Sequence, residues 1–130
     1  MSSGYGRHMS NDNFLYEGYW KEDRYHGEGK LVYSTGIYIE GTFVEGKLNG
    51  QGKQIWNDGQ RYTGEFKDGI LDGSGRCFYP DGSNYDGFWV DNKKQGYGVL
   101  TNSDGVKQGG DWHEDAFVAA REAAPEKVIA

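Results

Sequence analysis

The sequence of 130 residues contains one cysteine, Cys77, two prolines and no long apolar run. A single cysteine excludes a disulfide framework and a zinc site built from cysteines. No window approaches the roughly 18 apolar residues of a membrane-spanning helix, and the first residues lack the apolar core of a secretory signal. These absences predict a protein of a reducing compartment, the cytoplasm.

Basic residues are in the minority, with 14 Lys and Arg against 20 Asp and Glu, and the net charge is −6. An acidic chain without a basic block is poorly suited to bind nucleic acid or an anionic membrane surface. Leu and Ala are scarce, whereas the chain holds 22 Gly, 10 Tyr, 6 Phe and 4 Trp. This composition argues against a helical bundle and favours short strands joined by tight turns.

A motif of Tyr-x-Gly-x-aromatic recurs every 23 residues without an insertion. Its five copies begin at Tyr16, Ile39, Tyr62, Tyr85 and Gln108 and reach their aromatic at Trp20, Phe43, Phe66, Trp89 and Trp112. A Gly-x-Gly pair follows in four of them, at residues 27–29, 50–52, 73–75 and 96–98. Repetition at one fixed period is typical of a stacked repeat architecture.

Each unit contains two runs of strand character, which predict an all-β array of antiparallel hairpins. We expect strands near residues 16–21, 28–33, 39–44, 51–56, 62–67, 74–79, 85–90 and 97–101. Pairs such as Asp58-Gly59 and Asp68-Gly69 supply residues that adopt positive φ in hairpin turns. Because single hairpins are barely stable, they must stack into an elongated, single-layer sheet.

Glycine inside a strand weakens it, so its regular recurrence needs a physical reason. We predict that an aromatic ring from a neighbouring strand lies over the glycine backbone, at Gly50, Gly52, Gly73 and Gly75 among others.

Both ends of the chain depart from the pattern. Residues 1–15 are either a partial repeat, to which Gly4-Tyr5-Gly6-Arg7 would belong, or include an expression tag. Residues 108–114 form a decayed fifth unit. The spacing of Phe117, Ala120 and Ala124, followed by Pro125, predicts a short helix over 115–124 within the tail 115–130. Such a helix would cap an open sheet edge or dock a partner.

The unit Tyr-x-Gly-x-Trp/Phe, then Gly-x-Gly, then Asp-Gly resembles the MORN repeat (membrane occupation and recognition nexus) closely over residues 16–112, with four repeats at 16–107, and in part over 4–15. Ile39 and Gln108 replace the opening Tyr, and Asn102 replaces an aromatic. The resemblance implies an elongated single-layer antiparallel sheet. It also implies a non-catalytic adaptor or scaffold, in a cytoskeletal or a ciliary or flagellar assembly, or else a phospholipid-binding module.

No catalytic constellation is visible in the sequence. His8, His26 and His113 have no partner at a metal-ligand spacing, and Gly-x-Gly lacks the strand-to-helix context of a nucleotide loop. Cys77 stands where Leu31 and Leu100 stand in other units, so we expect it to be packed. The expectation is a protein without enzymatic activity, metal or cofactor.

A one-layer sheet has little to cover its faces, and a groove of partly exposed aromatic rings fits an extended or helical peptide. The same rings are also the first candidates for the core. The predicted protein-binding residues are Tyr16, Trp20, Tyr33, Phe43, Trp56, Tyr62, Phe66, Tyr79, Tyr85 and Trp89.

A lipid-binding alternative rests on three basic residues, Lys30, Lys53 and Arg76, which share one repeat position. Two strand spacings would place them about 10 Å apart. The net negative charge disfavours this alternative. Open sheet edges further suggest that two copies of the chain could pair.

Overall fold

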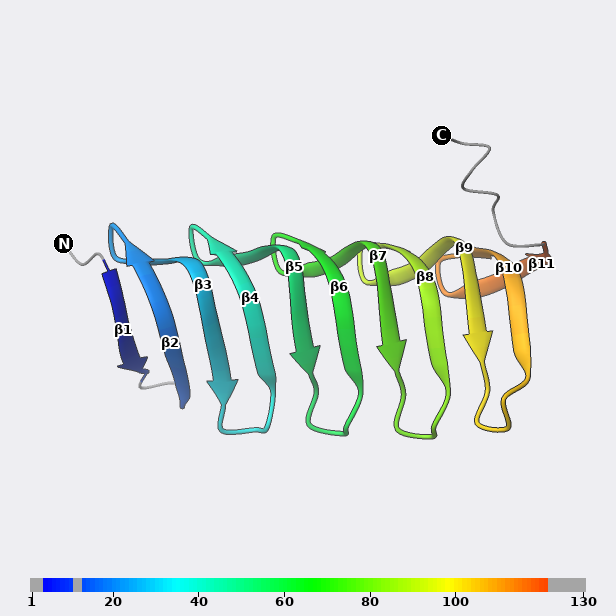
Figure 1. The fold of residues 1–130 in the computed structure, drawn as a ribbon, viewed down its shortest axis with the longest axis horizontal. Helices are drawn as coiled ribbons and strands as arrows, with labels where there is room; N and C mark the ends of the chain where they lie inside the picture. The colour runs from blue at the N-terminus through cyan, green and yellow to red at the C-terminus, as the bar shows by residue number, and fades with distance from the viewer. Residues whose placement is uncertain (1–3, 11–12, 122–130) are drawn as a thin grey trace.

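The computed structural model describes residues 4–10 and 13–121, which form one open sheet of eleven antiparallel strands in sequence order (Figure 1). None of the described residues belongs to a helix that could cross a membrane. The strands are β1 (Gly4–Met9), β2 (Phe14–Lys21), β3 (Arg24–Tyr33), β4 (Tyr38–Val44), β5 (Lys47–Ile55), β6 (Arg61–Lys67), β7 (Ile70–Phe78), β8 (Asn84–Val90), β9 (Lys93–Thr101), β10 (Lys107–His113) and β11 (Ala116–Ala120).

The strands predicted between residues 16 and 101 are all present, and the prediction of a single-layer all-β sheet is confirmed. The second strand of each unit begins four residues earlier than expected; β3, for example, starts at Arg24 rather than at residue 28. The reason is the turn before it, which consists of only two residues, Glu22 and Asp23, with φ of 52° and 67°. Both values are those of a type I′ turn, whose twist matches that of the flanking strands.

Five such two-residue turns follow one another at the period of 23 residues, and the first residue of each is acidic. They are Glu22-Asp23, Glu45-Gly46, Asp68-Gly69, Asp91-Asn92 and Glu114-Asp115. Successive turns are joined, because the second residue donates its N–H to a carbonyl of the preceding unit: Gly69 to Leu48 at 2.8 Å and Asn92 to Leu71 at 3.0 Å.

The fifth turn shows why the predicted capping helix is wrong. Glu114 and Asp115 have φ of 47° and 74°, and the chain then returns as β11, antiparallel to β10. The described part of the segment, through Arg121, is therefore not helical; residues 122–124 lie outside the described residues. The period of 23 residues already placed Glu114-Asp115 at a turn, and it was a stronger signal than the helical spacing of three apolar side chains.

At the other end, β1 pairs with β2 so that Gly4 lies opposite Trp20 and Gly6 opposite Gly18. This is the register with which β3 pairs with β4, where Gly27 lies opposite Phe43. The strand therefore takes the place of the second strand of a preceding unit.

Each unit contains the same irregularity in its hairpin. Between β6 and β7, Gly64 pairs with Gly75 and Phe66 with Leu71, so β7 carries two more residues than β6 over this stretch. Gly73 lies among these residues, with φ of 109°. Gly27, Gly50 and Gly96 hold the same position in the other units and also have positive φ, of 93°, 81° and 82°. The first glycine of each Gly-x-Gly pair is thus required by a backbone conformation that other residues rarely adopt.

The second glycine of each Gly-x-Gly pair is required for a different reason, which is the space that it leaves. A Cβ on Gly75 would collide with the ring and hydroxyl of Tyr62, and a Cβ on Gly98 with those of Tyr85. Rings therefore lie over this glycine, as predicted. The prediction is wrong for Gly50 and Gly73: a Cβ at Gly50 would meet nothing within 4 Å, and one at Gly73 would meet the Glu65 side chain.

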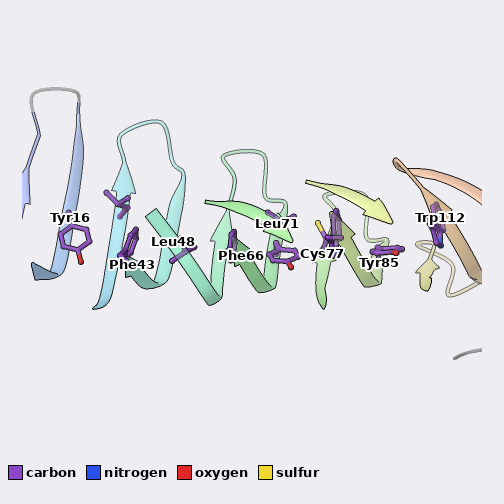
Figure 2. Close-up of a cluster of buried hydrophobic side chains, with 11 residues drawn as sticks. Tyr16, Phe43, Leu48, Phe66, Leu71, Cys77, Tyr85 and Trp112 are labelled. Carbon is purple, nitrogen blue, oxygen red and sulfur yellow. The ribbon is translucent and has the colours of Figure 1, made fainter. Parts of the chain in front are cut away.

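The eleven buried hydrophobic side chains of the described residues form one row on one face of the sheet, the aromatic face (Figure 2). They are Tyr16, Leu31, Phe43, Leu48, Tyr62, Phe66, Leu71, Cys77, Tyr85, Trp89 and Trp112. Tyrosine and tryptophan rings alternate edge to face, as between Tyr62 and Trp89 at 5.5 Å and Tyr85 and Trp112 at 5.4 Å. Such contacts stabilise beyond the area they bury, so each unit that opens with tyrosine is held by a ring of the next unit.

Gly75→Ala tests the contact between ring and glycine. We expect a loss of about 1–3 kcal/mol in the free energy of unfolding, because Tyr62 is fully buried and cannot move aside. The matched control is Gly52→Ala, in the unit where Ile39 replaces the tyrosine and the new Cβ meets Leu48 Cδ2 at 3.0 Å. Urea unfolding followed by circular dichroism measures both variants. Equal losses would contradict the interpretation.

Candidate functional site

The first ladder of predicted binding residues, on the first strand of each unit, lies in the core. Tyr16, Tyr62 and Tyr85 are fully buried, and Phe43, Phe66 and Trp89 nearly so. The tyrosine hydroxyls donate hydrogen bonds to the carbonyls of the bulge, Tyr16 to Tyr19 at 2.9 Å and Tyr62 to Glu65 at 3.0 Å. These side chains hold the sheet; of this ladder only Trp20, at the N-terminal end, is half-buried.

Burial also changes the acidity of these phenols. Desolvation raises the pKa of Tyr16 and of Tyr85 to about 12, and it raises the pKa of Tyr62 and Tyr79 as well. A free phenol titrates near 10, so the unfolded chain releases protons at a lower pH than the folded chain. Stability is therefore complete below about pH 10 and falls as the pH rises toward 12.

We expect the urea midpoint of the protein to decrease between pH 10 and pH 12 after staying level from pH 8 to pH 9.5. In Tyr85→Phe the decrease should be shallower, because one raised phenol is gone. The quantity compared is the change of the urea midpoint with pH. The midpoint itself should also be lower in the variant at every pH, because the hydrogen bond from Tyr85 to the Phe88 carbonyl is lost. A wild-type midpoint that does not change over this range would refute the role of the buried phenols.

The second ladder, at the end of the second strand of each unit, is more accessible. Tyr33, Trp56 and Tyr79 are half-buried and pack against the core row from its side. They recur at the period of the repeat, which corresponds to two strand spacings, or about 9.6 Å. This ladder is the part of the predicted site that is open to a partner.

A hollow of about 420 Å³ lies between Trp56 and Tyr79, two consecutive residues of this ladder. Its aromatic wall is formed by Trp56, Tyr79 and Trp89, and its polar groups come from Gln54, Gln60, Asn92, Lys94 and Asp115. The hollow is therefore a concave, partly aromatic surface with a few polar groups, which is the usual character of a recognition site.

Cys77 does not contribute a reactive group to this surface. It is fully buried, and its Sγ accepts a hydrogen bond from Gln60 Nε2 at 3.3 Å. Burial raises the pKa of the thiol, which disfavours the nucleophilic thiolate. Among the described residues, no three His, Cys, Asp or Glu side chains come close enough to hold a metal ion.

The three basic residues of the lipid alternative lie on the opposite, charged face, where each stands beside an acidic residue. The register across the strands is Glu17, Lys30, Glu40, Lys53, Thr63, Arg76 and Asp86. Lys53 Nζ lies 3.8 Å from Glu40 Oε1, and Arg76 Nη2 lies 2.7 Å from Asp86 Oδ2. The row holds three basic and three acidic residues, with the uncharged Thr63 between Lys53 and Arg76, and presents no net positive stripe.

A family model described as the MORN repeat matches residues 16–38, 40–61, 62–84 and 85–107. The chain belongs to the MORN-repeat family. A search of curated proteins finds none that matches. Each matched MORN repeat coincides with one hairpin, from β2–β3 to β8–β9, and MORN repeats are in general non-catalytic.

Sequence reasoning missed two kinds of residue in these MORN repeats. Asn49 and Gln95 accept the N–H of Asp68 and Glu114 in the next unit, both at 3.0 Å, and thereby join the turns. Lys94 lines the hollow and was not singled out. Alignment at 23 residues would have revealed it, because the same slot holds Tyr25, Leu48, Leu71 and Phe117.

Proposed function

We propose that this MORN-repeat protein is a non-catalytic adaptor that binds a segment of a partner protein along its aromatic face. The observation that carries the proposal is the half-buried ladder of Tyr33, Trp56 and Tyr79 beside an open hollow of about 420 Å³. Tyrosine and tryptophan are the residues that most often anchor protein interfaces. A cytoskeletal or a ciliary or flagellar assembly of the cytoplasm is the proposed setting, which the MORN family supports.

The spacing of the ladder determines which segments fit it. Two strand spacings amount to about 9.6 Å. A polyproline-II segment advances about 9.3 Å in three residues, and an α-helix advances about 10.5 Å in seven. The partner is therefore an extended segment with anchors every three residues or a helix with anchors every seven.

Selection of short random peptides on the immobilised full chain, followed by affinity measurements with single variants, tests the proposal. Trp56→Ala should weaken the selected peptides by about 30-fold, close to the 2 kcal/mol of an interface hot spot. The matched control is Phe88→Ala, which removes an aromatic that is 49 % exposed on the charged face and should leave affinity unchanged.

Folding of both variants is first confirmed by circular dichroism, because truncation of a packed Trp destabilises by about 3–5 kcal/mol in a full core. If the folded Trp56→Ala protein binds the peptides as wild type does while Phe88→Ala does not, the partner surface is the charged face and the proposal is wrong.

The lipid alternative is tested separately. Because Lys30, Lys53 and Arg76 each have an acidic neighbour on the charged face, we expect the protein to remain in the supernatant when vesicles containing phosphatidylserine are sedimented at physiological ionic strength. Vesicles of neutral phosphatidylcholine provide the baseline. Sedimentation with the anionic vesicles alone would support a membrane module instead.

A further inference from the structure

Lys94 occupies a slot that holds a core side chain in the other units. It lies opposite Trp89 across the hairpin β8–β9, as Leu71 lies opposite Phe66 and Leu48 opposite Phe43. In the described strands, every other lysine and arginine falls at a register position of the charged face. The aromatic face therefore contains a single Lys or Arg side chain in the part of the chain that the structure describes.

The surroundings of Lys94 keep its ammonium group partly desolvated. The side chain is 16 % exposed, and Nζ lies 5.6 Å from the ring centroids of Tyr79, Tyr85 and Trp112. Asp115 Oδ1 lies 3.7 Å from Nζ and also accepts the backbone N–H of Lys94 at 2.8 Å. An ammonium group has three donors, and its field acts more strongly in such a low-dielectric setting than in water.

Lys94 is also part of the wall of the hollow, beside Trp56 and Tyr79. A carboxylate entering the hollow would reach the ammonium while the apolar part of the same segment contacts the two rings. The fold itself does not need a charge here, because leucine fills the equivalent slot at Leu48 and Leu71. Replacing both partners of a buried ion pair by apolar residues is often neutral or stabilising, whereas removing one partner costs stability when the other charge stays buried. Asp115 is 50 % exposed, so its carboxylate stays hydrated when Lys94 is replaced.

A groove built from equivalent units does not determine where along its length a segment binds, and a single charge can determine it. Equivalent slots recur about every 9.6 Å, so a bound segment could slip by one unit with little change in its apolar contacts. In coiled coils, one polar residue in an otherwise apolar seam fixes register at a cost in stability. Lys94 is placed to do the same for a ligand.

We infer that Lys94 binds an aspartate or glutamate side chain of the partner segment and thereby fixes where that segment sits along the groove. The inference rests on the proposed function and names the chemistry of the partner. Charge complementarity supports it: Lys94 is the one cation that a carboxylate meets on the described aromatic face, where Asp115 lies on one side of the ammonium, whereas the protein as a whole, with a net charge of −6, repels a carboxylate.

The experiment uses the full chain as wild type, Lys94→Leu and Lys93→Leu. Lys93 is the adjacent, exposed lysine of β9 and points to the charged face, so both variants lose the same charge. Random short peptides are selected on each protein under identical conditions. Peptides from wild type and Lys93→Leu should share an acidic residue at a fixed distance from an apolar or aromatic anchor. Peptides from Lys94→Leu should keep the anchor and lose the acidic preference.

A synthetic peptide with the wild-type consensus should bind Lys94→Leu about 30-fold more weakly than wild type or Lys93→Leu. Its analogue with the acid replaced by the corresponding amide should bind wild type and Lys94→Leu equally. Lys94→Leu should unfold at nearly the same urea concentration as wild type, because Asp115 is half exposed and keeps the hydrogen bond from the backbone N–H of residue 94. An unchanged midpoint separates a role in recognition from a role in folding.

The failure of this inference can be distinguished from the failure of the proposed function. If peptides bind in a manner that depends on Trp56 but show no acidic preference, or keep that preference on Lys94→Leu, the inference is overturned and the adaptor proposal stands. If no selected peptide depends on Trp56, both are overturned.

Discussion

A single sheet with no second layer depends on the tyrosine rings that open its units, each of which lies over a glycine of its own hairpin and against a ring of the next hairpin. The tyrosine that opens a unit lies over the second glycine of its own hairpin and donates its hydroxyl to the carbonyl at the bulge, as Tyr62 does over Gly75 and to Glu65. The next unit then places a tryptophan edge against that ring. Because each hairpin buries its neighbour's ring, stability comes from adjacency rather than from a common core.

Much of this arrangement could be read from the sequence. The period of 23 residues, the two strands of each unit and the turn positions follow from where glycine, aspartate and aromatics recur. The two glycines of Gly-x-Gly could not be separated, since one is required by backbone conformation at Gly73 and the other by space at Gly75. The spacing of apolar residues after Glu114 suggested a helix. The segment instead forms β11 and pairs with β10, because this pairing continues the hydrogen bonding of the sheet.

The candidate site was predicted less completely than the fold, and the reason is physical. Periodicity identifies which aromatics recur but not which face or depth each one reaches. Tyr85 and Tyr79 recur equally in the sequence, yet Tyr85 is fully buried and Tyr79 lines an open hollow. The basic row likewise looked continuous in sequence, whereas the pairing of strands places an acidic residue beside Arg76 and beside Lys53.

The repetition that stabilises the fold also offers a ligand several equivalent binding positions along the sheet. Units with identical contacts bind a long segment well but do not determine its position, so specificity depends on departures from the repeat. Ile39 removes a ring from one unit, and Lys94 adds a charge to another. The first departure is compensated inside the sheet, where Leu48 and Phe66 contact Gly52. The second pairs with Asp115 in a slot where the sheet accepts leucine in two other units, and it faces the hollow where a partner would lie. A charge that breaks the pattern in a slot where leucine suffices for the fold is the one expected to serve recognition.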